Sequence, residues 1–186
     1  MKKIKRVTFF GHSEADEESK DYQDAVESAR LLAEQGITIV NGGGPGIMKA
    51  SSVGAQKGGG KSIGITFETA GMTTFEGVDK SNPADQKMIE PNYWQRTQRL
   101  MDLGDVYVFF NGGTGTVSEF GMAWGLARLF FGQHKPLILF GSWWHDITEA
   151  FGQNMKIRQE ELQVYEIVNT PQQVLEEIKE LDLKIS

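Results

Sequence analysis

Short apolar runs alternate along this chain with longer segments in which apolar residues recur at helical spacing. The run at 7–10 is followed by a segment from 19 to 35 in which Ala25, Ala29 and Leu32 share one helical face, and Gly36 predicts the end of that helix. The same alternation continues along the chain. It predicts further strands at 37–40, 62–66, 106–110, 137–140 and 164–168, and further helices at 47–57, 92–104, 115–131, 142–158 and 171–181.

Strands that are separated by helices of ten or more residues predict a parallel sheet with helices on both faces. We therefore expect one doubly wound, Rossmann-like α/β nucleotide-binding domain over residues 1–186, with no linker that divides it. The stretch from 67 to 91 is rich in Thr, Gly, Asp, Asn and Pro and has no clear period. It predicts a long loop, and such loops in compact domains are often functional lids.

The segment from Asn111 to Glu119 reads NGGTGTVSE and joins a predicted strand to a predicted helix. Glycines let the backbone approach a phosphate closely, and the N–H groups at a helix start attract its negative charge. A carboxylate at Glu119 would be repelled by that phosphate unless it serves another part of the ligand, such as a sugar hydroxyl. The segment therefore predicts a nucleotide site with a catalytic or sugar-holding acid.

A purely structural interpretation also fits this segment. Thr116 and Glu119 have the spacing of a capping box, in which both side chains satisfy free N–H groups at a helix start. A second glycine-rich turn, NGGGPG at 41–46, favours the ligand interpretation because it too joins a predicted strand to a predicted helix. In a parallel sheet such turns share the carboxyl edge, where ligands bind.

Neither turn carries a known signature for a larger nucleotide. No Gly-Lys-Ser/Thr follows, as a Walker A motif requires, and the spacing is not G-x-G-x-x-G followed by an acidic residue at the end of the next strand. A mononucleotide therefore fits these turns better than NAD or ATP hydrolysis does.

Composition narrows the partners. The net charge is −6 and the isoelectric point is about 5.1, so no basic face indicates nucleic acid or an anionic membrane as a partner. Cysteine is absent, which excludes thiolate chemistry, and no histidine pairs with acids at metal-ligand spacing, so we expect no metal and no cofactor. With no signal-like or membrane-length apolar run in this sequence, we expect a cytoplasmic protein.

The order of these features resembles a known family. Arg96 is separated by fourteen residues from the 111–119 segment. Together with Gly42-Gly43-Gly44-x-Gly46-Ile47-Met48 and Gly11 to Ser13, it resembles the pattern of the LOG ("lonely guy") family. Its members are nucleoside 5′-monophosphate phosphoribohydrolases that were long mislabelled as lysine decarboxylases. The resemblance extends from about residue 5 to 180. It implies a homodimer that hydrolyses the N-glycosidic bond of a nucleoside monophosphate to free base and ribose 5-phosphate.

The resemblance also implies roles for individual residues. The catalytic pair falls on Arg96 and Glu119. The nucleotide-binding residues, with those taken from the neighbouring turns, are Gly11, Ser13, Gly43, Gly44, Gly46, Arg99, Gly112, Gly113, Thr114, Gly115 and Thr116. Two positions depart from the family, which usually has Pro where this chain has Asn111 and Lys where it has Thr97. The missing lysine leaves a phosphate less well neutralised unless Arg99, one helical turn from Arg96, replaces it.

The chemistry also follows from the residues. Cleavage of a ribosyl C1′–N bond builds positive charge on the sugar, so a nearby carboxylate stabilises the transition state and orients water. Arg96 could neutralise the phosphate, keep Glu119 ionised or assist departure of the base. A polysaccharide glycosidase would need two carboxylates, and the sequence places one. Lysine decarboxylation would need a Schiff-base lysine for pyridoxal phosphate, and no lysine stands in such a setting.

Two other protein classes remain as alternatives. Molybdenum-cofactor carriers resemble this sequence in the glycine-rich turns and hold their ligand without turnover, and DNA-processing proteins use a similar fold. The acidic charge disfavours the second class. Small residues at Gly121, Ala123, Gly125 and Ala127 permit close packing of the predicted 115–131 helix on the sheet or on a symmetry-related helix, which favours a homodimer.

Overall fold

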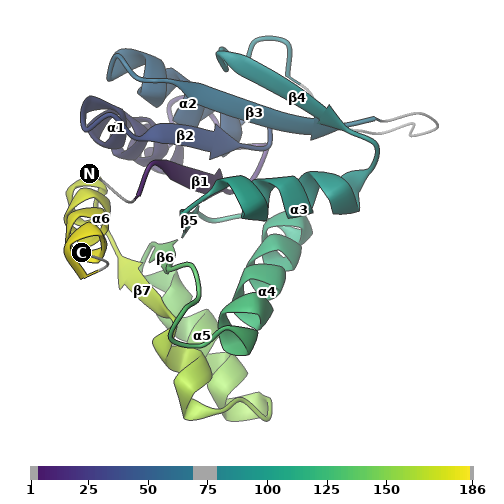
Figure 1. Ribbon diagram of the computed structural model, residues 1–186, viewed down its shortest axis with the longest axis vertical. Coiled ribbons are helices and arrows are strands. Elements are labelled where there is room, and N and C mark those ends of the chain that lie inside the picture. Colours follow the sequence, from purple (N-terminus) through teal and green to yellow (C-terminus); the bar gives the residue numbers. More distant parts are fainter. Residues whose placement is uncertain (1–3, 69–78, 185–186) are drawn as a thin grey trace.

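The computed structural model describes residues 4–68 and 79–184. These residues form a seven-stranded sheet in the order β4-β3-β2-β1-β5-β6-β7, and every pairing is parallel. Figure 1 shows the sheet running from β4 at the top to β7 at the bottom. The strands are β1 (Arg6–Phe10), β2 (Thr38–Asn41), β3 (Ser62–Phe67), β4 (Gln86–Glu90), β5 (Val106–Phe109), β6 (Leu137–Phe140) and β7 (Tyr165–Val168).

Helices cover both faces of the sheet, as the alternation predicts. One face carries α1 (Lys20–Glu34), α2 (Ile47–Lys57) and α6 (Pro171–Lys184), and the other carries α3 (Tyr93–Leu103), α4 (Thr114–Leu129) and α5 (Trp143–Asn154). The doubly wound, Rossmann-like α/β architecture is thereby confirmed. Among the helices within the described ranges, none has the length and apolar character needed to cross a bilayer.

Strand residues point alternately to the two faces, which gives the fold two hydrophobic cores. In β5, Val106 and Val108 join the core under α1, α2 and α6, whereas Tyr107 and Phe109 join the core under α3, α4 and α5. Strand β5 is buried throughout. This explains why the central strands are continuous apolar runs rather than alternating ones.

The sequence prediction is wrong in two segments. The stretch 67–91, expected to be one loop, contains β4, which pairs in parallel with β3 at the edge of the sheet; residues 69–78 of that stretch lie outside the described residues. Strand β4 was missed because an edge strand buries little and its QKMIE sequence has few apolar positions. Helix α5 ends at Asn154 rather than 158, since Met155 is extended, and a short 3-10 helix, η1 (Gln159–Gln163), follows.

Candidate functional site

The strand order reverses between β1 and β5, so the loops that follow these strands diverge from the same point of the sheet. Such a reversal at the carboxyl edge is where open α/β sheets bind ligands. The two loops are joined there, because the His12 backbone N–H donates to the Asn111 carbonyl at 3.0 Å and the Phe110 N–H donates to the Phe10 carbonyl at 2.8 Å.

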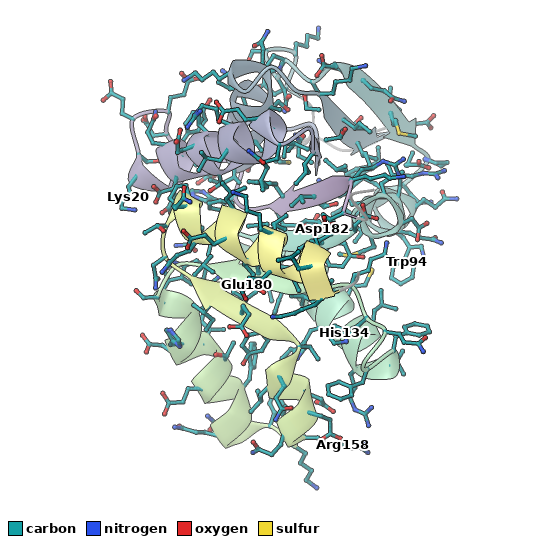
Figure 2. The ribbon with its side chains drawn as sticks, turned by 60° about the vertical axis from the view of Figure 1, so that its left-hand side comes forward. Lys20, Trp94, His134, Arg158, Glu180 and Asp182 are labelled. Carbon is teal, nitrogen blue, oxygen red and sulfur yellow. The ribbon has the colours of Figure 1, made fainter. Side chains whose placement is uncertain are left out.

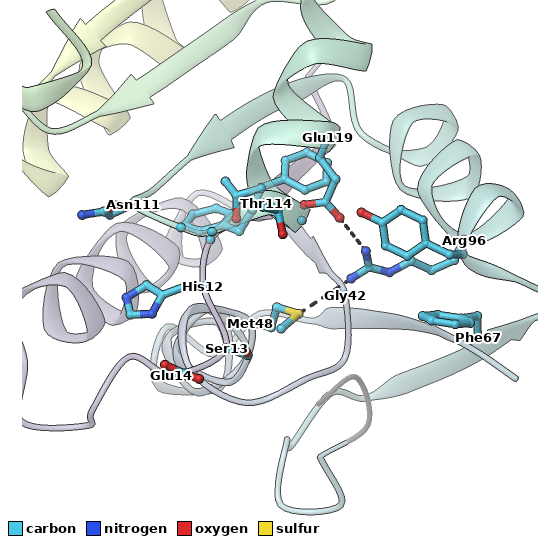
Figure 3. A pocket seen from close by; sticks show the side chains of 18 residues that line it. His12, Ser13, Glu14, Gly42, Met48, Phe67, Arg96, Asn111, Thr114 and Glu119 are labelled. Carbon is cyan, nitrogen blue, oxygen red and sulfur yellow. Dashed lines mark hydrogen bonds and ion pairs between the residues drawn. The ribbon is translucent and has the colours of Figure 1, made fainter. Parts of the chain in front are cut away.

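A cavity of about 650 Å³ opens between these loops (Figure 3). Its volume falls in the range of small-molecule sites. The wall is formed by residues of β1 and the loop after it, the two glycine-rich turns, α2, β3, α3 and α4. These residues are Phe9, Phe10, Gly11, His12, Ser13, Glu14, Gly42, Met48, Phe67, Tyr93, Arg96, Asn111, Gly112, Gly113, Thr114, Gly115, Thr116 and Glu119.

One wall of the cavity is the N-terminus of α4. The helix begins at Thr114 after Gly113, and no side chain caps it. The N–H groups of its first turn have no partner within the helix, and they carry the positive end of the helix dipole. Gly112 permits the turn, since a Cβ there would lie 2.1 Å from Thr116 Oγ1. All the predicted residues of the 112–116 loop line the cavity, so the N–H groups of this helix start are next to it.

The capping-box interpretation does not hold. Thr116 lies inside the first turn of α4, because the helix begins three residues earlier than a Thr116 cap would require. Glu119 does not fold back on the helix start, since its carboxylate is bound by Arg96 of α3. Thr116 and Glu119 therefore do not cap the helix. Both line the cavity, and Glu119 also binds Arg96 of α3.

Arg96 and Glu119 form a buried ion pair at the centre of the site. Arg96 Nη1 donates to Glu119 Oε1 at 2.5 Å, and the two residues are 9% and 5% exposed. The remaining nitrogens of the guanidinium are also engaged: Nε donates to the Ile65 carbonyl at 3.2 Å and Nη2 contacts Met48 Sδ at 3.8 Å. The guanidinium also lies 5.7 Å from the centre of the Tyr93 ring. Each of the three guanidinium nitrogens of Arg96 thus has a partner.

This arrangement bears on the charge of Glu119. Burial raises the pKa of the Glu119 carboxyl, while the positive charge and hydrogen bond of Arg96 act in the opposite direction. Of the roles open to Arg96, the geometry favours holding Glu119 ionised, because the guanidinium is already committed to that carboxylate.

Gly42 lines the cavity, whereas the sequence predicted Gly43, Gly44 and Gly46 of the same turn as the binding residues. A Cβ at this position would lie 1.8 Å from Arg96 Nη2 and 2.6 Å from Met48 Sδ. Glycine is therefore required for the guanidinium to lie across the turn. The run of glycines at 42–44 was the visible signal, but it did not show which glycine faces the arginine.

The other glycines of the second turn do not line this cavity. The Gly43 N–H donates to Asn41 Oδ1 at 2.8 Å, and the Gly44 carbonyl accepts from Asn82 Nδ2 at 2.9 Å. Gly46 has a positive φ of 60°, and a Cβ there would lie 2.3 Å from the His12 carbonyl oxygen. These three glycines therefore shape the 41–46 turn and its packing against the loop after β1. The Gly43 N–H is already bonded to Asn41.

The remaining predicted residues divide between the cavity and the surface. Gly11 and Ser13 line the cavity. Arg99 does not, because it faces β4, where its Nε donates to Glu90 Oε1 at 2.9 Å. Thr97 is buried away from the wall, and its hydroxyl has no hydrogen-bond partner among the described residues. The geometry thus gives no support to Arg99 as a replacement for a missing lysine.

The fold and the site define a Rossmann-like α/β protein with an uncapped helix start and a buried Arg–Glu pair beside one cavity at the reversal of strand order. Residues 4–174 match the model of the SLOG cluster4 family, and the chain belongs to that family. The resemblance to the LOG/SLOG superfamily is therefore confirmed.

Individual relatives agree with this assignment at the level of the fold. A molybdenum cofactor binding protein from Rippkaea orientalis superposes with a TM-score of 0.73 at 21% identity, over 97% of this chain and 99% of that chain. The molybdenum cofactor carrier protein from Chlamydomonas reinhardtii gives 0.70 at 17% identity, over 96% and 98%. An uncharacterized protein from Archaeoglobus fulgidus is 27% identical over 139 residues, which are 75% of this chain and 86% of that protein.

Proposed function

We propose that this protein hydrolyses the N-glycosidic bond of a nucleoside 5′-monophosphate. One observation carries the proposal: the uncapped start of α4 and the buried carboxylate of Glu119 face the same cavity. The first fits a phosphate, and the second fits a sugar that becomes positively charged.

The spacing along α4 suits a phosphorylated ribose. Glu119 lies three residues beyond Thr116, which is about 4.5 Å along the helix axis. Cα–Cβ bonds on a helix tilt toward its N-terminus, so the Glu119 side chain leaves α4 in that direction before Arg96 binds its carboxylate on the cavity wall. A phosphate bound by the N–H groups at 113–116 thereby places the ribose next to Glu119.

The chemical step uses water and few protein groups. The C1′–N bond breaks and the base leaves with the electron pair, while the sugar develops oxocarbenium character that the Glu119 carboxylate stabilises. Water oriented by this carboxylate adds to C1′, and its proton is passed on to the departing base. Arg96 keeps Glu119 ionised and in place, so the negative charge is already present when the sugar becomes positive.

The part of the cavity that Phe67 and the Tyr93 ring line offers a place for the base. Phe67 and Tyr93 meet edge to face with ring centres 5.7 Å apart, and Met48 lines the same cavity on the other side of the Arg96 guanidinium (Figure 3). Aromatic and thioether groups fit a flat heterocycle. These residues belong to α2, the end of β3 and the start of α3, and they favour stacking over hydrogen bonding as the mode of base recognition.

The test is release of free base and ribose 5-phosphate from a panel of nucleoside 5′-monophosphates. We expect turnover with at least one member, and loss of about a hundredfold or more in Glu119→Gln and Glu119→Ala. Glu90→Gln, which removes an acid that lies outside the cavity, is the matched control and is expected to retain activity. Turnover that survives in both Glu119 variants would contradict the proposal.

A carrier that holds a phosphorylated ligand without turnover is the second candidate. It is favoured by one observation: within the described part of the chain, the only arginine or lysine on the cavity wall is Arg96, which is committed to Glu119. The fold likeness to molybdenum-cofactor carriers agrees with it. Nucleotide binding by calorimetry with no base release from any member of the panel would select this candidate.

We also propose that two chains associate through α4. Its outward side, here called the α4 face, exposes Val117, Leu126, Leu129 and Phe130. Trp94 of the adjacent helix α3 is 65% exposed and projects from the fold in Figure 2. Gly121 and Gly125 lie in open space between these apolar residues, so a second helix can approach closely. A homodimer would cover a surface that is otherwise unusually apolar.

A further inference from the structure

The charges on the cavity wall are unusual for a site that takes phosphate. Among the described lining residues, the Arg, Lys, Asp and Glu side chains are Glu14, Arg96 and Glu119. Arg96 and Glu119 neutralise each other in their buried pair. Glu14 remains as a charge without a counterion on this wall, and its sign is the same as that of the ligand.

Glu14 lies in the loop after β1, which is fixed against both glycine-rich turns. The His12 N–H donates to the Asn111 carbonyl, and the His12 carbonyl accepts from the Ile47 N–H at 3.1 Å. Figure 3 shows Glu14 at the side of the cavity where His12 and Ser13 lie, away from Phe67. The carboxylate therefore stands at the polar part of the cavity rather than at the aromatic part.

The acidic character continues beyond Glu14. A second hollow of about 300 Å³ adjoins the cavity, shares Ser13 and Glu14 with it, and is also lined by Asp16, Glu17, Asp79 and Lys49. Lys49 Nζ pairs with Glu17 Oε1 at 2.7 Å. A ligand that extended past the helix start toward this hollow would enter a region of net negative charge.

We propose that Glu14 restricts this cavity to ligands with a single phosphate. The inference rests on the proposed phosphate site at the start of α4 and adds a determinant of specificity to it. The N–H groups and dipole of one helix start can bind one phosphate, and their positive charge of about one half is already less than the negative charge of that phosphate. Each further phosphate brings more negative charge, finds no free cation on the described wall and is repelled by Glu14.

The test compares adenosine mono- and diphosphate binding by calorimetry, together with inorganic phosphate and pyrophosphate, which carry no base or glycosidic bond. EDTA is present so that Mg²⁺ does not mask the diphosphate charge. Glu14→Gln removes the charge, and Glu18→Gln removes an equal charge from an exposed position of the same loop that lines neither hollow.

We expect Glu14→Gln to improve diphosphate binding relative to monophosphate about fivefold at low salt, with a smaller gain at 0.5 M salt because screening weakens charge repulsion. Glu18→Gln is expected to leave the ratio unchanged. A ratio that is equal in wild type and Glu14→Gln overturns this inference and leaves the phosphate site intact. Failure of all four probes to bind overturns the phosphate site and the inference together.

Discussion

The Arg96 guanidinium donates to the Glu119 carboxylate across 2.5 Å in a pair that is almost entirely withdrawn from water. The pair joins α3 to α4, so it contributes to stability as well as to the site. Removal of one partner from a buried pair leaves an uncompensated charge, at a cost of about 3 kcal/mol or more. We expect Arg96→Met and Glu119→Gln each to lower the free energy of unfolding by about this amount in urea titrations.

The double variant provides the control for that prediction. Because neither charge remains, Arg96→Met combined with Glu119→Gln is expected to cost clearly less than the sum of the single changes. Additive costs would show that the two side chains do not depend on each other.

The pH dependence of base release follows from the burial of Glu119. The carboxyl must be ionised to stabilise the sugar cation, and burial raises its pKa above the ordinary 4.5. Activity is therefore expected to fall on the acid side at a pH above 4.5, and Arg96→Gln should move this limb to higher pH by removing the cation that lowers the pKa. The profile of kcat/KM against pH measures both. Arg99→Gln, on the same helix but outside the cavity, should leave the limb in place.

Substitution of Gly42 tests whether the turn positions Arg96. In Gly42→Ala the new methyl carbon would lie 1.8 Å from Arg96 Nη2, which is far shorter than a van der Waals contact, so the guanidinium must move. We expect a loss of about 1–3 kcal/mol in stability and a larger fall in kcat than in affinity for the nucleotide. Gly152→Ala is the control, since its nearest neighbour, Leu162 Cδ1, is 3.7 Å away. Normal kcat in Gly42→Ala would contradict the positioning role.

The phosphate wall is tested at Gly115, where space allows a side chain. The nearest atom to an added Cβ is the Tyr93 hydroxyl at 3.9 Å. Gly115→Asp places a negative charge in the first turn of α4 and is expected to weaken monophosphate binding about tenfold, whereas the isosteric Gly115→Asn should weaken it much less. Equal affinities of the two variants would show that the ligand's phosphate lies elsewhere.

The α4 face is tested by sedimentation. We expect the wild type to sediment as a dimer and Leu129→Glu to shift it toward monomer, because a charge within an apolar interface is left without water or a partner. Leu183→Glu replaces an equally exposed leucine on α6 and serves as the control. A wild type that sediments as a monomer would contradict the proposed association through the α4 face.

Much of the fold and part of the site could be predicted from the sequence. The apolar run before Asn111 and the glycines after it fixed β5, the start of α4 and the wall at 112–116, because these signals are local. Gly42 could not be recognised, since its importance lies in a contact with Arg96, 54 positions along the chain. Arg99 was placed with Arg96 by helical spacing alone, and only the presence of β4 explains why it faces Glu90 instead. Strand β4 could not be predicted, because an edge strand has few buried positions and therefore a weak hydrophobic pattern.

Every described residue on the cavity wall precedes position 120. The last third of the chain, with β6, β7, α5 and α6, adds no group to the wall, and instead covers β5 and completes the two cores. Chemistry and support are thus separated along the polypeptide. Substitutions after this point are therefore expected to alter the thermal resistance of the fold more than the choice of ligand, and substitutions before it are expected to alter both.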